Sequence, residues 1–180
     1  MNIRETRTAD LPAVMGIIEE ARRTIAALGI NQWQNGTPNA AMIEEDILKR
    51  QGRVAEIDGE AVGTFALILD GEPTYAVIED GGWSLPDRDR DGGWSYLAIH
   101  RVAISVAHRG SGISTAILDY AAETARSLGR SSLRIDTHEG NTVMRRMLER
   151  HGFIHRGTIH LENGDPRVAY ERLLTGGLPS

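Results

Sequence analysis

The chain has 180 residues, a formal net charge of −5 and no cysteine, so it has no disulfide, no cysteine-ligated zinc and no cysteinyl thioester intermediate. Its acidic balance argues against nucleic acid as a partner, because phosphate binding needs a basic surface. The sequence contains no apolar run of about 18 residues and no secretory pattern at the first residues, so we expect a cytoplasmic protein without a membrane span.

The pattern of apolar residues predicts one α+β domain over residues 1–175. Helical spacing begins after Asp10, expected to cap that helix, and again after Asn39. Asp58-Gly59 is a hairpin signal. The alternating charges of residues 87–91 are typical of a solvated loop, and a flap over a binding site is the alternative. The expected elements are strand 2–7, helices 10–29 and 39–48, strands 53–57 and 61–69, irregular segment 70–93, strand 97–106, helix 113–128, strand 131–137, a helix after Asn141, and strands 154–161 and 167–173.

The most informative segment is 109–114, Arg-Gly-Ser-Gly-Ile-Ser, between a predicted strand and a predicted helix. A strand, a short turn and a helix N-terminus expose several main-chain N–H groups at one point, where the helix dipole favours an anion. Gly110 and Gly112 let the backbone approach a ligand closely, and Arg109 offers a planar donor fork. The segment therefore predicts a phosphate or pyrophosphate site.

Other interpretations of this turn stay open at this point. A Walker loop would need a lysine that is missing, and a dinucleotide site lacks its third glycine, although Asp136 lies at a suitable distance. The residues around Ser114 half-resemble a nucleophile elbow, but a small serine hydrolase would need more chain and a suitable triad. A capped helix with glycines for close packing is the remaining alternative.

Two motifs resemble a known family. Arg109-x-x-Gly112-x-Ser114 resembles the acetyl-CoA signature of the GNAT N-acetyltransferase superfamily, Arg/Gln-x-x-Gly-x-Gly/Ala, with Ser114 in place of the last small residue. The segment from Asn141 to Phe153 is similar to the family's second signature. The resemblance covers residues 97–153 and implies the acyl-CoA N-acyltransferase fold, a mixed sheet of about seven strands with about four helices.

The resemblance also implies acetyl-CoA as co-substrate. Strand main-chain groups would pair with the pantetheine arm, the glycine turn would hold the pyrophosphate, and Asn141 and Met144 would lie along the pantetheine. Asn141 as a helix cap and Met144 as a core residue are the alternatives. The implied cofactor-binding residues are Val102, Ala103, Ile104, Arg109, Gly110, Ser111, Gly112, Ile113, Ser114, Asn141 and Met144.

Acetylation of an amine requires a base that removes the ammonium proton. We expect His100 to be this catalytic residue, because histidine titrates near neutral pH and relatives carry one at a similar strand position; a structural histidine is the alternative, with Glu79 and Asp80 as substitutes. The family's tyrosine acid is replaced by Leu148, so water would have to serve the thiolate. The other histidines lack metal-ligand spacing, so no metal is expected.

The acceptor is expected to be a primary amine of a small molecule or a peptide. The predicted substrate-binding residues are Trp33, Tyr96 and His138, although Trp33, Trp83 and Trp94 could instead fill the core beneath loops. The sequence thus predicts an N-acetyltransferase working by direct transfer. A catalytically weak acyl-CoA-binding or regulatory module on the same fold is the alternative, and a nucleotide-binding domain is the third. A homodimer is a further expectation, because small GNAT proteins often pair.

Overall fold

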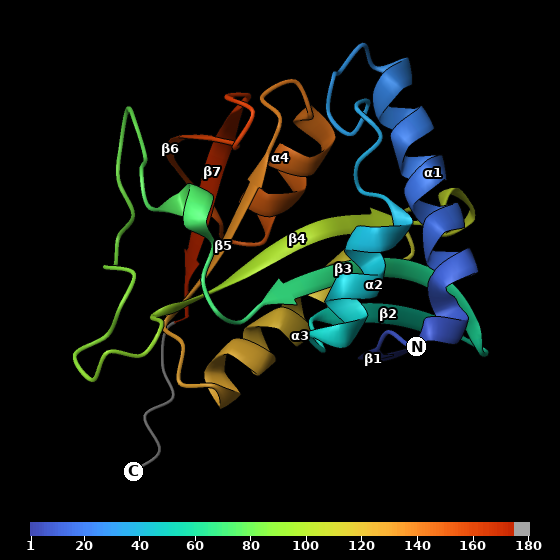
Figure 1. Cartoon of the computed structure of the whole chain (residues 1–180), viewed down its shortest axis with the longest axis horizontal. Coiled ribbons are helices and arrows are strands. Elements are labelled where there is room, and N and C mark those ends of the chain that lie inside the picture. Colours follow the sequence, from blue (N-terminus) through green and yellow to red (C-terminus); the bar gives the residue numbers. More distant parts are fainter. Residues whose placement is uncertain (175–180) are drawn as a thin grey trace. The chain divides into compact units, whose positions relative to one another are not determined.

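A computed structural model describes residues 1–174 of the chain, so the predicted domain end at residue 175 lies outside the described residues. The order of helices and strands is the predicted one, with three short 3-10 turns added (Figure 1). The elements are β1 (Asn2–Glu5), η1 (Thr8–Asp10), α1 (Leu11–Ala27), α2 (Ala40–Leu48), β2 (Gly52–Ile57), β3 (Glu60–Ile68), η2 (Pro73–Tyr75), β4 (Tyr96–Ile104), η3 (Val106–His108), α3 (Ile113–Ser127), β5 (Ser132–Thr137), α4 (Thr142–Arg150), β6 (Ile154–His160) and β7 (Pro166–Leu173).

Within residues 1–174 the strands form a seven-stranded sheet in the order β1-β2-β3-β4-β5-β7-β6, which confirms the predicted mixed sheet. The pairs β1–β2, β2–β3, β5–β7 and β6–β7 are antiparallel, and β4–β5 is parallel. The β4–β5 register runs from Tyr96–Ser132 to Ala98–Arg134 and then ends, although β4 continues to Ile104. No helix in this part of the chain combines the length and apolarity needed to cross a bilayer.

The described residues divide into two compact units, the first formed by Met1–Leu67 with His100–Ile117. In this unit α1 and α2 pack on the strands (Figure 1), and their contact buries the apolar residues that helical spacing predicted. The Asn39 side chain accepts a hydrogen bond from Met42 N at 3.1 Å, which confirms the predicted cap of α2. The buried cluster consists of Val14, Ile18, Ile43 and Val54.

The predicted side-chain cap at Asp10 is wrong. Asp10 occupies the N-cap position of α1, but η1 runs directly into this helix, so Asp10 is already helical and its side chain does not cap α1. Its carboxylate instead accepts from Arg7 N at 2.7 Å and from the Arg4 guanidinium at 2.7 and 2.8 Å. The acid therefore ties η1 to β1.

The second unit comprises Ile68–Ile99 and, among the described residues, 118–174. Its core gathers Tyr75 and Tyr96 with small and aliphatic residues of β4, β6 and β7, and Trp83 and Trp94 pack against this cluster while partly buried. The interpretation of these two tryptophans as core-filling residues is thus confirmed. Segment 70–93 is irregular as predicted, with the 3-10 turn η2.

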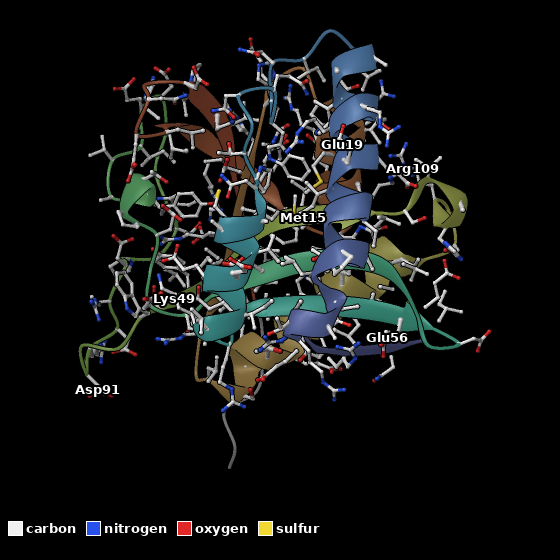
Figure 2. All side chains as sticks on the ribbon, turned by 45° about the vertical axis from the view of Figure 1, so that its right-hand side comes forward. Met15, Glu19, Lys49, Glu56, Asp91 and Arg109 are labelled. Atoms are coloured by element: carbon white, nitrogen blue, oxygen red, sulfur yellow. The ribbon has the colours of Figure 1, made fainter. Side chains whose placement is uncertain are left out.

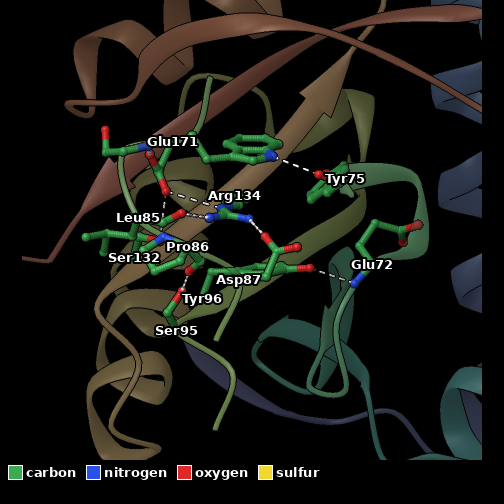
Figure 3. Close-up of polar contacts among 12 residues, drawn as sticks. Glu72, Tyr75, Leu85, Pro86, Asp87, Ser95, Tyr96, Ser132, Arg134 and Glu171 are labelled. Atoms are coloured by element: carbon green, nitrogen blue, oxygen red, sulfur yellow. Dashed lines mark hydrogen bonds and ion pairs between the residues drawn. The ribbon is translucent and has the colours of Figure 1, made fainter. Parts of the chain in front are cut away.

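A buried arginine holds this irregular segment against the sheet (Figure 3). Arg134 of β5 is 0% exposed and donates to Glu171 at 3.2 Å, to Asp87 at 2.6 Å and to the Leu85 carbonyl at 2.6 Å. Its guanidinium lies 4.0 Å from the ring centroid of Tyr96. The prediction of a merely solvated loop at residues 87–91 is therefore wrong for Asp87, since this carboxylate neutralises a buried cation.

Candidate functional site

The glycine turn after β4 has the geometry of an anion site. Gly110 and Gly112 adopt φ of +80° and +84°, and a Cβ built on either would meet no atom within 4 Å. Both positions thus need glycine for its backbone conformation, and open space lies beside them. The first main-chain bond of α3 runs from Ala116 N to Gly112 O at 3.1 Å, so the earlier amides of this turn precede the helical ladder.

Helix α1 braces the chain before this turn. Glu20 Oε2 accepts from Val106 N at 2.8 Å, at the start of η3. Arg109, the predicted phosphate ligand, is exposed beside α1 (Figure 2), and its Nη2 donates to Thr24 Oγ1 at 3.0 Å. A guanidinium carries five N–H donors, so this bond orients Arg109 and leaves donors for an anion.

Strand β4 carries a conformational irregularity beside the predicted base. Arg101 has φ +56°, a left-handed backbone that costs a side-chain-bearing residue ~1–2 kcal/mol. Its guanidinium binds Asp46 of α2 through two bonds, Nε to Oδ2 at 2.8 Å and Nη2 to Oδ1 at 2.5 Å. Burial raises the pKa of Asp46, and the charge and hydrogen bond of Arg101 oppose this rise. His100, the predicted base, is half-buried next to Arg101, and its electrostatic interaction with Asp46 also opposes the rise of the Asp46 pKa.

The predicted cofactor residues of α4 belong to the second unit. Asn141 Oδ1 accepts from Met144 N at 3.2 Å, so the cap interpretation of Asn141 is confirmed, while its role toward pantetheine stays a prediction. Leu148 is 0% exposed, in a core position. Tyr170 is no evident replacement for the missing acid, because its hydroxyl accepts from Arg145 Nε and donates to Glu149 Oε1, each at 3.0 Å.

The three predicted acceptor residues have different surroundings. Trp33 lies in the loop after α1, and its partly buried side chain packs against the cluster of Ile17, Ala21 and Ala103. Tyr96 is 1% exposed and its hydroxyl accepts from Glu72 N at 2.9 Å, so almost none of this predicted substrate contact is open to an amine. His138 is half-buried at the end of β5, and its Nδ1 accepts from Gly140 N at 3.0 Å.

Sequence reasoning missed the residues that hold these segments in place. Asp46 had a signal, because this acid stands between the apolar Ile43 and Ile47 of the same helix, where a charge needs a partner. Glu20 and Thr24 had none, since acids and hydroxyls are ordinary on an exposed helix face. Among residues 1–174 no group of three or more metal-binding side chains gathers.

Comparison with known proteins identifies the family. The model of the acetyltransferase (GNAT) family matches residues 28–153. A GNAT-family acetyltransferase from Streptococcus agalactiae is 33% identical, with a TM-score of 0.83 over 96% of this chain and 94% of that one. One from Listeria monocytogenes is 19% identical, with a TM-score of 0.72 over 96% and 94%. The protein yncA of Salmonella typhimurium, solved with its cofactor acetyl-CoA, is 19% identical, with a TM-score of 0.63 over 100% and 97%. No curated protein matches the sequence.

The chain belongs to the GNAT acetyltransferase family. The predicted fold is confirmed, and so is the predicted enzyme class, an acetyl-CoA-dependent acyltransferase that uses acetyl-CoA as co-substrate. The dinucleotide and hydrolase interpretations of the glycine turn give way to this assignment.

Proposed function

We propose that the protein transfers the acetyl group of acetyl-CoA directly to a primary amine of a small molecule or peptide. The observation that carries this proposal is the turn from Arg109 to Ser114, where two left-handed glycines lead into the N-terminus of α3 beside open space. Main-chain N–H groups and the helix dipole at such a point favour a pyrophosphate.

The end of β4 would bind the rest of the donor. Because the register with β5 ends at Ala98, the main-chain groups of Val102, Ala103 and Ile104 lie beyond it. Backbone groups at such an edge can pair with the amides of an extended ligand, as an added strand does. An N–H of this segment would also polarise the thioester carbonyl, which makes the carbonyl carbon more reactive.

His100 is the proposed general base. It lies on β4 two residues before Val102, so the strand that would bind the donor also carries the base. The imidazole would take the ammonium proton, directly or through water, and the neutral amine would attack the thioester carbonyl. Since Leu148 has no proton to give, water would protonate or solvate the departing thiolate.

Thiol release from acetyl-CoA tests the proposal. Purified protein is assayed with a panel of polyamines, aminoglycosides, amino acids and peptides, and calorimetry measures binding of CoA. We expect saturable CoA binding and amine-dependent thiol release. His100→Ala should lower turnover, shift its pH profile and leave CoA affinity largely intact, whereas His160→Ala, at an exposed histidine of β6, serves as the control. Full activity of His100→Ala would remove His100 as the base.

The buried Leu148 favours a second candidate, a catalytically weak acyl-CoA-binding or regulatory module. CoA binding without thiol release for any amine would support this module over the enzyme. The organisation as one domain, a cytoplasmic location and a homodimer remain parts of the proposal. Light scattering after size-exclusion chromatography measures the assembly state directly.

A further inference from the structure

Strand β4 changes character at Arg101. From Tyr96 to Ile99 every residue is buried, whereas from His100 to Ile104 only Ala103 is. The left-handed φ of Arg101 stands between the two parts, where an extended strand would have a negative φ. The irregular backbone at Arg101 therefore affects the direction of the main chain at His100 and at the last three residues of β4.

The ion pair between Arg101 and Asp46 of α2 stabilises β4 in this unfavourable backbone conformation. Both oxygens of Asp46 bind the Arg101 guanidinium, and a planar bidentate pair fixes direction as well as distance. Asp46 is 5% exposed, so little water competes for the pair.

Asp46 is itself held by its surroundings. Its carbonyl accepts from Gln51 N at 2.8 Å, which ties the end of α2 to the start of β2. A Cβ on the neighbouring Gly52 would lie 3.0 Å from Thr6 Oγ1 and 3.5 Å from Asp46 Cβ, so the chain is closely packed there. The acid thus offers Arg101 a firm attachment point.

We propose that Asp46 and Arg101 are positioning residues for acetyl transfer: their ion pair holds β4 in its left-handed conformation and so places His100 and the main chain of Val102–Ile104. The proposal rests on the proposed function of these groups. Neither side chain has to touch the donor or the amine. A displacement of about 1 Å in such groups lowers rates by about 100-fold, so loss of the pair acts on turnover as well as on stability.

Asp46→Asn is the first test, with Asp10→Asn as matched control. Asp10 also forms a bidentate pair with an arginine, at 2.7 and 2.8 Å from Arg4, but on β1 and η1. We expect both variants to melt at lower temperature. Only Asp46→Asn should lower kcat for thiol release, by about 10- to 100-fold, and weaken CoA binding several-fold. Wild-type kcat and CoA affinity in folded Asp46→Asn would overturn the proposal.

A pair of double variants keeps the test decisive if the single variant does not fold. Asp46→Asn/Arg101→Gly and Asp46→Asn/Arg101→Ala both lack the ion pair, but only glycine adopts a positive φ without strain. We expect the glycine variant to keep a kcat at least about fivefold above that of the alanine variant. If the ion pair served stability alone, glycine would improve the melting temperature but not kcat, so the two double variants would have equal kcat values. Equal kcat values, or a better alanine variant, would contradict the proposal.

The same experiments separate this inference from the proposed function. If the wild type binds CoA but releases no thiol with any amine, direct transfer fails. CoA affinities of the same variants then decide the positioning role: several-fold weakening specific to Asp46→Asn supports it, and unchanged affinity overturns it. If the wild type does not bind CoA, both proposals fall together.

Discussion

The arginines of the two units have different surroundings. In the first unit, Arg101 binds Asp46 and Arg109 binds Thr24, and both lie in segments proposed to contact the donor. In the second unit, Arg134 is buried beneath the loop that it holds. The same guanidinium chemistry thus serves two purposes. Arg109 stays exposed with donors to spare, while Arg134 makes bonds with Glu171, Asp87 and a carbonyl and lies against two aromatic rings. A buried arginine whose three nitrogens all have partners thus acts as a structural residue, whereas an exposed arginine held by a single bond remains available to a ligand.

The largest effect is expected at Arg134. Arg134→Met leaves the buried Glu171 with Arg156 as its remaining cation at 3.4 Å, and breaking a buried pair costs ~3–5 kcal/mol. Urea denaturation measures this loss. Arg88→Ala, which removes a guanidinium lying 3.7 Å over the Trp94 ring at the surface, should cost under ~1 kcal/mol. Replacing both partners, in Arg134→Met/Glu171→Gln, should restore part of the lost stability. An equal loss of stability in Arg134→Met and Arg88→Ala would contradict the structural role assigned to the buried arginine.

Arg109→Ala tests whether the exposed arginine of the first unit binds the donor. It should weaken CoA binding by ~1–3 kcal/mol, because a charge-assisted bond to a phosphate is lost, and change stability little. Calorimetry with CoA measures the affinity, and Arg126→Ala, an exposed arginine in the last turn of α3, is the control. An affinity equal to that of the wild type would show that Arg109 does not bind the phosphate.

Gly112→Ala sharpens the distinction between a structural and a ligand-binding turn. Gly112 and Gly129 have φ of +84° and +70°, and a Cβ on either meets nothing within 4 Å. Alanine at either position should therefore cost ~1–2 kcal/mol of stability through backbone strain alone. Only Gly112→Ala should also weaken CoA binding, since only that turn is proposed to hold pyrophosphate. Equal CoA affinities in the two variants would argue against the pyrophosphate site.

The smallest expected effect is the pH dependence of stability at two acids of the first unit, Asp10 and Asp46. The hydrogen bond from Arg4 lowers the pKa of Asp10, so the ionised acid stabilises the fold above its ordinary pKa near 4, and this contribution is lost as pH falls. Burial raises the pKa of Asp46, so ionisation of this acid costs folding stability, and this cost disappears as pH falls and the carboxyl is protonated. The stability difference between wild type and Asp10→Asn, under ~1 kcal/mol, should shrink below about pH 4. A difference that grows there would reverse the assigned sign.

Local signals in the sequence determined the order of elements, the cap at Asn39 and the glycine turn at residues 109–114. Each depends on neighbours a few residues away, and the preference of glycine for a positive φ or of asparagine for a cap acts at that range. Co-occurrence of two motifs over residues 97–153 then pointed to the GNAT family, which the comparisons confirm.

Which charges pair with one another depends on the packing of the folded chain. Arg134 pairs with acids 47 and 37 residues away, and Arg101 pairs with an acid 55 residues away. Spacing along the chain carries no information at such separations, so the sequence by itself predicts a solvated Asp87 and a substrate contact at Tyr96, whereas the structure pairs Asp87 with Arg134 and buries Tyr96. Burial forces each of these polar groups to find a partner, and which partner lies within reach is fixed by the packing of helices and loops on the sheet.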